Sequence, residues 1–434
     1  MFQPDQESMP REMLEALQVD RLRETLMRVY DNVETYRTKF DDAGFDPATL
    51  TSLADLADIP FTVKDDLRAA YPFGMFAVPR NEIVRVHASS GTTGQITVVG
   101  YTAGDIQMWS DMMARTLSAG GASPDDVVQI AYGYGLFTGG LGVHYGSERL
   151  GALTIPISGG NTRRQVQIMA DFGVTVLACT PSYALYVAET AAEMGIDIRE
   201  LPLRLGFFGA EPWSDSMRLK IEETLGITAM DIYGLSEVLG PGVAFECTEH
   251  AGLHVNEDAF IIEIVDPDTL RPVPDGQVGE VVFTTIAKEG IPVIRYRTRD
   301  ISRIVTGTCS CGRTFRRMQR VFGRTDDMLI IRGVNVFPSQ IEQVLASVPG
   351  VAPHYQVILT RQGSLDNVAV QVEISPDIEF DEIRELEGLQ RRVRAAIESA
   401  LAVSIAVKLV EPKSIQRSEG KARRVVDLRG QGEA

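Results

Sequence analysis

The stretch Ser89-Ser90-Gly91-Thr92-Thr93-Gly94-Gln95 combines hydroxyl side chains with glycines whose backbone amides are sterically open. Residues 82–88 (EIVRVHA) and 97–102 (TVVGYT) are predicted to be strands, which places the small residues at the tip of a hairpin. It is not a Walker loop, because Gln95 follows the last glycine and no helical run comes after it. A loop of this kind suits polyphosphate, but alone it is more often a polar turn.

Composition limits the classes of protein to which this chain can belong. It has 434 residues, of which 44% are hydrophobic, enough to form a large core in two or more domains. A formal charge of −17 disfavours a nucleic-acid partner, because a phosphate backbone would be repelled. The first residues (MFQPDQESMPRE) lack the features of a targeting segment, and no apolar run reaches about 18 residues. With only four cysteines, we expect a cytoplasmic protein without a membrane partner.

Hydrophobic periodicity predicts an α/β fold. An amphipathic helix is expected over residues 12–40. A mixed body then alternates strands such as 175–179 and 205–209 with helices such as 213–225. Residues 280–286 and 291–297 alternate as antiparallel strands after the turn at 274–276. We therefore predict a large N-terminal body of several subdomains, built from mixed sheets and helices, over residues 1–325.

The pattern changes after Asp326. Ser339-Gln340-Ile341-Glu342 is typical of a capping box that opens a helix. Strands at 355–360 and 367–374, a helix at 380–401 and a strand at 405–410 are expected to follow. This arrangement predicts a separate small α+β domain over residues 326–434.

A series of short motifs extends from the hairpin loop toward the C-terminus. They are SSGTTGQ (89–95), YGYGLF (132–137), TGGLG (138–142), ISGGNT (157–162), CTPSY (179–183), FGAEPW (208–213), DIYGLSE (231–237), IRYRTRD (294–300), GRTDDM (323–328) and RSEGK (417–421). In this order, over nearly the whole chain, they resemble the phenylacetate-CoA ligase family of adenylate-forming enzymes. The family usually has SSGTTGKPT in the hairpin loop, so Gln95 departs from its pattern.

The resemblance implies an AMP-forming acid-thiol ligase. Such an enzyme converts phenylacetate or a related aromatic carboxylic acid, ATP and coenzyme A into aryl-CoA, AMP and pyrophosphate through an acyl-adenylate, with Mg²⁺ as cofactor. One alternative is an adenylating enzyme that passes the acyl group to a carrier-protein thiol or an amine. Another is a nucleotide-binding regulator without catalysis. The presence of Glu237, Asp300, Arg324 and Lys421 together argues against it, because a protein that only binds a nucleotide needs no mobile lysine. The resemblance is also compatible with a homodimer.

The same resemblance assigns residues to the nucleotide. Glu237 would help bind Mg²⁺, a hard cation that prefers oxygen ligands. Asp300 would accept both ribose hydroxyls, with Arg324 as a donor beside it. The expected ATP-binding residues are Ser89, Ser90, Gly91, Thr92, Thr93, Gly94, Gly209, Ala210, Glu211, Pro212, Asp231, Tyr233, Gly234, Ser236, Asp300 and Arg324.

Lys421 ends a polar, glycine-containing segment near the C-terminus, where exposed lysines are ordinary. By resemblance it is catalytic together with Glu237, and it inserts into the active site to bridge the substrate carboxylate and the α-phosphate. Asp326 matches the family's hinge. Rotation of a mobile C-terminal domain about this hinge would withdraw Lys421 before the thiol attacks.

Aromatic residues near these motifs could stack on an aryl ring or could belong to the core. Those considered are Tyr132, Tyr134, Phe137, Phe207 and Phe208, and the expected pocket consists of Tyr132, Phe137, Phe207 and Gly209. Asn256 replaces a tryptophan that is frequent in the family. It leaves the place of a bulky aromatic vacant, which predicts a less strict preference for phenylacetate.

The cysteines indicate a second site. Cys309 and Cys311 form a knuckle-like pair, and Cys247 with His254 would complete a tetrahedral zinc site of structural type. His250 could replace His254, and the alternative is a pair of exposed thiols near a turn. No G-x-S-x-G or Cys/His/Asn order supports a hydrolase.

Overall fold

The computed structural model describes residues 1–89, 96–331, 334–362, 365–376, 378 and 383–429. Its helices are α1 (Pro4–Glu7), α2 (Arg11–Asn32), α3 (Glu34–Ala43), α4 (Lys64–Ala69), α5 (Ala103–Ala119), α6 (Thr138–Leu150), α7 (Thr162–Phe172), α8 (Pro181–Glu193), α9 (Asp215–Leu225), α10 (Pro338–Ala346) and α11 (Ile383–Leu401). Short 3₁₀ turns lie at Pro47–Thr49, Leu53–Asp58, Arg80–Glu82 and Ile198–Glu200. No helix in these ranges is long and apolar enough to cross a bilayer.

The largest sheet is half parallel and half antiparallel. Across it the strands are β13 (Ile304–Val305), β14 (Arg317–Met318), β9 (Leu253–Val255), β8 (Gly240–Glu246), β7 (Thr228–Leu235), β6 (Leu205–Phe208), β5 (Val176–Cys179), β3 (Val127–Ile130) and β4 (Leu153–Ile155). From β7 to β4 all neighbours are parallel. β5 and β6 are buried along their whole length, which explains their continuous apolar sequences.

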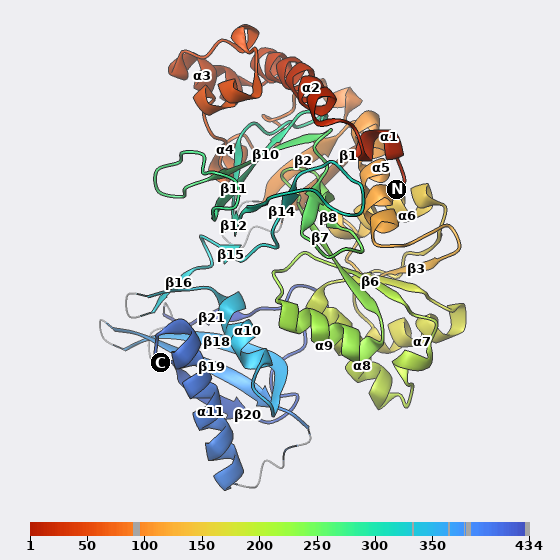
Figure 1. Cartoon of the computed structure of the whole chain (residues 1–434), viewed down its shortest axis with the longest axis vertical. Coiled ribbons are helices and arrows are strands. Elements are labelled where there is room, and N and C mark those ends of the chain that lie inside the picture. Colours follow the sequence, from red (N-terminus) through yellow and green to blue (C-terminus); the bar gives the residue numbers. More distant parts are fainter. Residues whose placement is uncertain (90–95, 332–333, 363–364, 377, 379–382, 430–434) are drawn as a thin grey trace.

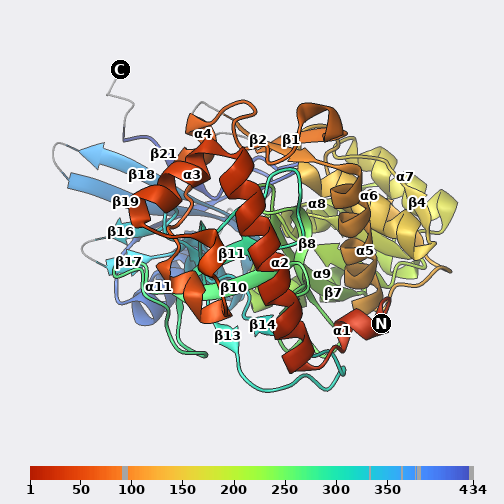
Figure 2. The same ribbon diagram turned by 90° about the horizontal axis from the view of Figure 1, so that it is seen from above.

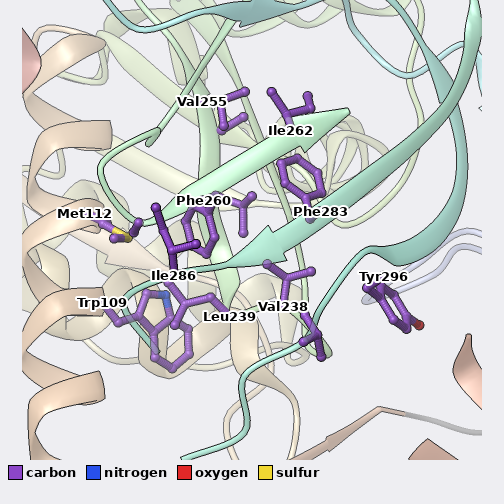
Figure 3. Close-up of a cluster of buried hydrophobic side chains, with 14 of the residues drawn as sticks. Trp109, Met112, Val238, Leu239, Val255, Phe260, Ile262, Phe283, Ile286 and Tyr296 are labelled. Atoms are coloured by element: carbon purple, nitrogen blue, oxygen red, sulfur yellow. The ribbon is translucent and has the colours of Figure 1, made fainter. Parts of the chain in front are cut away.

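A second, antiparallel sheet contains β10 (Phe260–Val265), β11 (Gly279–Thr285), β12 (Tyr296–Ser302) and β15 (Gly323–Arg324). Figure 3 shows the buried cluster in which its Phe260 and Phe283 lie with Trp109 and Met112 of α5. Figure 2 shows α2 lying across β10 and β11, where the Gln18 side chain donates to the Phe260 carbonyl.

The predicted hairpin is confirmed on both sides of the glycine loop. β1 (Arg85–Ser89) pairs antiparallel with β2 (Thr97–Tyr101), and Ser89 lies opposite Thr97. The loop from Ser90 to Gln95, with the predicted phosphate-binding residues Ser90, Gly91, Thr92, Thr93 and Gly94, lies outside the described residues.

The C-terminal part has its own sheet and core. β18 (Val351–Gln362) and β19 (Leu365–Ile374) are antiparallel, and β21 (Val425–Asp427) and β20 (Ala406–Val410) add parallel strands at the two edges. α10 and α11 pack on it with Ile341, Leu389 and Val393 fully buried. Figure 1 shows these elements in blue at the lower left, beside α8 and α9, with β15 and β16 (Leu329–Ile331) between them and the upper part of the chain. β16 pairs with β17 (Val334–Val336).

Three expectations about local structure were wrong. The helix expected over residues 12–40 is broken at Val33, whose extended backbone ends α2 and begins α3. The strand expected at 291–297 begins only at Tyr296, because Arg295 adopts a positive φ of 45°. Ser339 does not cap α10; the Gln340 side chain accepts from the amide of Phe337 instead.

Candidate active site

The predicted ribose carboxylate is held by two side chains of the N-terminal body. Asp300 on β12 accepts from the Tyr233 hydroxyl at 2.6 Å and from Arg324 Nη1 at 3.0 Å. Asp300 and Arg324 are also direct partners across β12 and β15, so the register of the sheet sets this pair. Burial raises the pKa of Asp300, and the Arg324 guanidinium opposes that effect. The arrangement fixes one carboxylate rigidly in a buried place.

Arg324 also contacts the predicted hinge. Its Nε and Nη2 donate to the two carboxylate oxygens of Asp326, at 2.9 and 3.1 Å. The same guanidinium therefore joins Asp300 to the residue at which the second part of the chain begins.

The turn after β6 has little steric freedom. A Cβ on Gly209 would lie 2.3 Å from the Ile232 carbonyl oxygen, which excludes any larger residue. Ala210 has a φ of 71°, a left-handed conformation that costs energy for alanine. Strain of this kind is common where a backbone must follow a ligand, and it is consistent with the predicted role of these two residues.

Glu237 lies in the connection between β7 and β8 and is almost fully buried. Its Oε1 lies 3.0 Å from Nζ of Lys64, at the start of α4. A buried carboxylate paired with a half-exposed ammonium can exchange that partner for another cation. Glu237 therefore suits a hard cation such as Mg²⁺.

Lys421 enters this site from the C-terminal part of the chain. Thr180 donates to the Gly420 carbonyl at 3.0 Å, and Glu211 accepts from the Ala422 amide at 2.8 Å, so contacts on both sides hold the lysine. Burial and Arg324 lower the pKa of Lys421, while Glu237, Glu211 and Asp300 oppose the shift. Its Nζ is 5.9 Å from the centre of the Phe137 ring. Residues distant in sequence thus surround one ammonium.

Other predicted ATP-binding residues surround this centre in supporting positions. The Ser236 hydroxyl lies 3.1 Å from that of Thr138. Asp231 is buried and accepts from Trp213 Nε1 and Arg320 Nε, and burial raises its pKa. A Cβ on Gly234 would lie 1.8 Å from the Gly240 carbonyl oxygen. Pro212 is exposed, and the buried Ser89 hydroxyl has no partner among the described residues.

The predicted aromatic pocket divides into two groups. Phe137 is half-buried beside Lys421. The Tyr132 hydroxyl is buried and has no hydrogen-bond partner among the described residues. Phe207 instead packs beneath Gly120, where a Cβ would lie 2.5 Å from its ring. Its position favours the core interpretation.

Tyr134 and Phe208 also have partners in the scaffold. The Tyr134 hydroxyl contacts His144, and Phe208 is fully buried against Trp213. Asn256 is also fully buried, donates to the Gly242 carbonyl and accepts from Arg115. The Asn256 side chain is part of a buried hydrogen-bond network. The structure therefore does not show the vacant space that was expected where the family frequently has a tryptophan.

Ion pairs further from the centre connect the two parts of the chain. Glu189 on α8 accepts from His354 Nε2 at 2.5 Å and from Arg417 Nε at 2.9 Å. Both donors hold the pKa of Glu189 below its usual range against the effect of burial. Lys413 pairs with Glu193 one turn further along α8. We call these pairs the α8 contacts.

The predicted zinc ligands lie together at another place. The ligand atoms of Cys247, His254, Cys309 and Cys311 all lie within 4.8 Å of one another. The sulfurs of Cys247 and Cys309 are 3.7 Å apart, and Cys311 Sγ is 3.4 Å from His254 Nε2. Zinc–sulfur bonds of about 2.3 Å in a tetrahedron require sulfurs about 3.8 Å apart, so the donor set fits the ion. The open alternative, His250, contacts Arg218 and Glu246 instead.

The thiols of Cys247 and Cys311 in this cluster differ in pKa. Burial raises the pKa of Cys247 to about 12. Burial would also raise the pKa of Cys311, but hydrogen bonds from His254 and Arg313 lower it to about 5. At least one ligand is therefore prepared as a thiolate, the form that binds metal.

Two groups of residues were missed by sequence reasoning. Lys64 stands in the ordinary segment Thr62-Val63-Lys64-Asp65, and tertiary contacts such as the isolated bridge between Thr62 and Tyr296 bring it to Glu237. The α8 contacts join charged residues of one helix to His354 on β18 and to Lys413 and Arg417 in the connection between β20 and β21. No local pattern in the sequence distinguishes them from a solvated surface.

Comparison with known proteins places this geometry in a family. Residues 13–287 match the AMP-binding enzymes, and residues 333–429 match the AMP-binding enzyme C-terminal domain. The chain is 52% identical to the phenylacetate-coenzyme A ligase of Escherichia coli, over 96% of this chain and 95% of that protein. It is 49% identical to the corresponding ligase of Thermus thermophilus, over 99% and 100%.

A solved structure agrees. The 2-hydroxyisobutyryl-CoA ligase in the postadenylation state, in complex with R3-HIB-AMP, is 31% identical and superposes with a TM-score of 0.92 over 98% of this chain and 91% of that chain. The same ligase in the thioesterification state, with 2-HIB-AMP and CoA, gives a TM-score of 0.73 over 98% and 92%. The chain belongs to the phenylacetate-CoA ligase family of the AMP-binding, adenylate-forming enzymes.

Proposed function

We propose that this chain is an AMP-forming aryl acid–CoA ligase that activates phenylacetate or a related aromatic acid as an acyl-adenylate and transfers the acyl group to CoA. The observation that carries the proposal is the convergence of Lys421 with Glu237, Glu211, Asp300 and Arg324, all of which influence its pKa. A site that only binds a nucleotide has no need of an ammonium delivered from a separate part of the chain.

Each of these groups has a role in joining two anions. The Lys421 ammonium would offset the negative charge that builds up between the substrate carboxylate and the α-phosphate. The Asp300 carboxylate, fixed by Tyr233 and Arg324, would accept the ribose hydroxyls. Glu237 would hold Mg²⁺, which supplies charge neutralisation for the pyrophosphate leaving group when bound.

The acid would lie between Phe137, Tyr132 and the turn at Gly209. Phe137 lies beside Lys421, so an aryl ring placed against it would have its carboxylate near the ammonium. The buried Tyr132 hydroxyl has no hydrogen-bond partner among the described residues and is free to contact a ligand. The names of the close relatives support an aromatic acid, and phenylacetate in particular.

Asp326 would act as the hinge between residues 1–325 and 326–434. The higher TM-score with the postadenylation state than with the thioesterification state supports a two-position cycle, of which the described conformation corresponds to the first. Rotation would break the contacts at Gly420 and Ala422 and withdraw Lys421.

We also propose that Cys247, His254, Cys309 and Cys311 bind a structural zinc ion. Four protein ligands leave no position for a reactive water, so the ion would stabilise the fold without taking part in the reaction.

The test of the proposed reaction is a panel of aromatic acids with ATP and Mg²⁺. Pyrophosphate release should depend on the acid, and an aryl-CoA should form only when CoA is added. Transfer to an amine or a carrier protein but not to CoA would favour the alternative adenylating enzyme. Formation of ADP and phosphate would contradict the proposal.

A further inference from the structure

The connection that carries Glu237 is held by three side-chain hydrogen bonds from outside it. The carbonyl of Val238 accepts from Lys288 Nζ at 3.1 Å, that of Leu239 from the Tyr101 hydroxyl at 2.5 Å, and that of Pro241 from Trp109 Nε1 at 2.8 Å. We call Lys288, Tyr101 and Trp109 the carbonyl cradle. Figure 3 shows Trp109 with Val238 and Leu239 in one buried cluster.

Lys288 is the unusual member of the cradle because its side chain is fully buried. A buried ammonium is costly unless its protons and its charge find partners. One proton goes to the Val238 carbonyl, and Nζ also lies 4.7 Å from the centre of the Tyr101 ring, within cation–π range. The carboxylates of Asp105 and Glu237 favour its charged form, against a burial effect that lowers its pKa to about 8. The carboxylate that the connection carries therefore helps to stabilise this buried charge.

The segment that carries Lys288 is itself fixed. Asp105, at the start of α5, accepts from the amides of Glu289 and Gly290 at 2.7 and 2.9 Å, and from the Thr102 amide at 2.9 Å. The junction of β2 and α5 thus holds residues 289 and 290, and Lys288 next to them cannot shift independently.

The two aromatic members complete the support. The rings of Tyr101 and Trp109 are stacked at 5.2 Å with an interplanar angle of 13°. Gly240 passes so close to Trp109 that a Cβ would lie 2.3 Å from the ring, and its φ is 130°. The connection after β7 is therefore closely packed on the cradle and has few alternative conformations.

We propose that Lys288 is a positioning residue for Glu237, and that its hydrogen bond to Val238 and its buried charge hold the Glu237 carboxylate in the orientation that binds the metal–ATP complex. Tyr101 makes a second, weaker contribution through the next carbonyl. The inference rests on the proposed function, because it concerns the adenylation step. It predicts a defect confined to the half-reaction that uses the metal.

The test compares two half-reactions in purified full-length variants. Lys288→Met removes the ammonium at nearly constant volume, and Tyr101→Phe removes only the hydroxyl. For Lys288→Met we expect pyrophosphate release to fall by about 100-fold, the scale of one lost electrostatic group, and the half-saturating Mg²⁺ concentration to rise at least about tenfold. Thioester formation from supplied phenylacetyl-adenylate and CoA should stay within about twofold of the wild-type rate.

Two further measurements keep the test decisive. Titration calorimetry of ATP with Mg²⁺, without any acid, should show about tenfold weaker binding in Lys288→Met, a readout that does not depend on turnover. Thr116→Val is the matched control, since Thr116 is buried on the same helix as Trp109 and its hydroxyl donates to the Met112 carbonyl of that helix. It should leave the Mg²⁺ dependence unchanged.

An equal loss in both half-reactions, or an unchanged Mg²⁺ requirement in Lys288→Met, would overturn the inference. If Lys288→Met does not fold, Tyr101→Phe decides: a raised Mg²⁺ requirement supports the cradle, and wild-type behaviour contradicts it. A wild-type protein that releases no pyrophosphate with any aryl acid would instead refute the proposed function, which separates the two failures.

Discussion

Asp300 and Lys421 belong to the same site but are held in opposite ways. Asp300 is buried, paired across a sheet, and bonded to Tyr233 and Arg324 within the N-terminal body. Lys421 is held by backbone contacts at Gly420 and Ala422 and by the α8 contacts further out. Under the proposed function, the group needed in both half-reactions is thus fixed by buried side chains, whereas the group needed only in the first is held by contacts that can open.

The largest expected effect comes from Lys421→Ala. Adenylation should fall by about 10² to 10³, the scale of one lost transition-state donor, while thioester formation from a supplied acyl-adenylate stays near wild type. Burst measurements of pyrophosphate and thioester would separate the two steps. Lys220→Ala is the control, because its half-exposed ammonium pairs with Glu223 on the same helix, outside the site. Equal losses in both steps would show that Lys421 supports the fold.

The lowered pKa of Lys421 gives this prediction a pH dependence. Its ammonium should lose its proton at a lower pH than an ordinary lysine. Adenylation needs the charged form, so its rate should decline on the alkaline side before thioester formation declines. Parallel alkaline limbs for the two steps would contradict this assignment.

Asp300→Asn should reduce both half-reactions rather than one. Loss of a charged acceptor for the ribose is worth roughly 10- to 100-fold in nucleotide affinity, the range of a hydrogen bond to an ionised group. Calorimetry with ATP and with an adenylate analogue would measure both losses. Weaker binding of ATP but not of the adenylate analogue would show that Asp300 does not bind the ribose in both half-reactions.

Asp326→Pro should affect only the second half-reaction. Proline fixes φ, and the rigid backbone should slow thioester formation at least about tenfold, roughly 1.4 kcal/mol in the barrier, with adenylation unchanged. Asp326→Ala is the matched control, since it removes the carboxylate that pairs with Arg324 but leaves the backbone free. If alanine slows the step as much as proline does, the ion pair and not the hinge is responsible.

Glu189→Gln should have a smaller effect, on the first half-reaction instead of the second. Removing the charge that pairs with His354 and Arg417 weakens the first position of the small domain, so adenylation should slow about two- to fivefold, the range of a partly exposed ion pair. Glu193→Gln, which removes the more exposed pair with Lys413, should change less. Stopped-flow comparison of the two variants would rank the α8 contacts.

Removal of zinc should leave the ratio of the two half-reactions unchanged. Chelation, or Cys309→Ser with Cys311→Ser, should lower the melting temperature by several degrees, because metal binding contributes to folding. Elemental analysis and calorimetry of the untreated protein would check this. Absence of zinc from protein purified without chelator, or an unchanged melting temperature, would contradict the structural role.

The reaction class could be predicted from the sequence more fully than the contacts that position the site residues. The paired strands around the glycine loop, the two-part α/β fold and the Cys247–His254–Cys309–Cys311 cluster follow from local patterns and ordered motifs. The capping of α10 and the break at Val33 could not be predicted from the sequence. Several polar side chains near the start of α10 could cap it, and a helix can be interrupted at more than one residue, so local patterns do not decide between these possibilities. Both belong to the scaffold.

Residues whose role arises from tertiary proximity were not predictable. Lys64 and Lys288 are single lysines in unremarkable segments, and only the folded sheets bring them to Glu237 and to the carbonyl that follows it. Phe207 was considered for the pocket because it is aromatic, but β6 directs it into the core beneath Gly120. One-dimensional patterns do not determine which face of a fully buried strand meets a ligand.

The central claim is that the Lys421 segment must leave before the thiol reacts. Cysteines in place of Glu193 and Lys413, which contact each other across the two parts of the chain, can be joined by a short bis-maleimide linker. Wild-type protein treated with the same reagent is the control. We predict that the linked protein releases pyrophosphate at the rate of the unlinked double variant but forms almost no aryl-CoA. Aryl-CoA formation at the unlinked rate would contradict the claim.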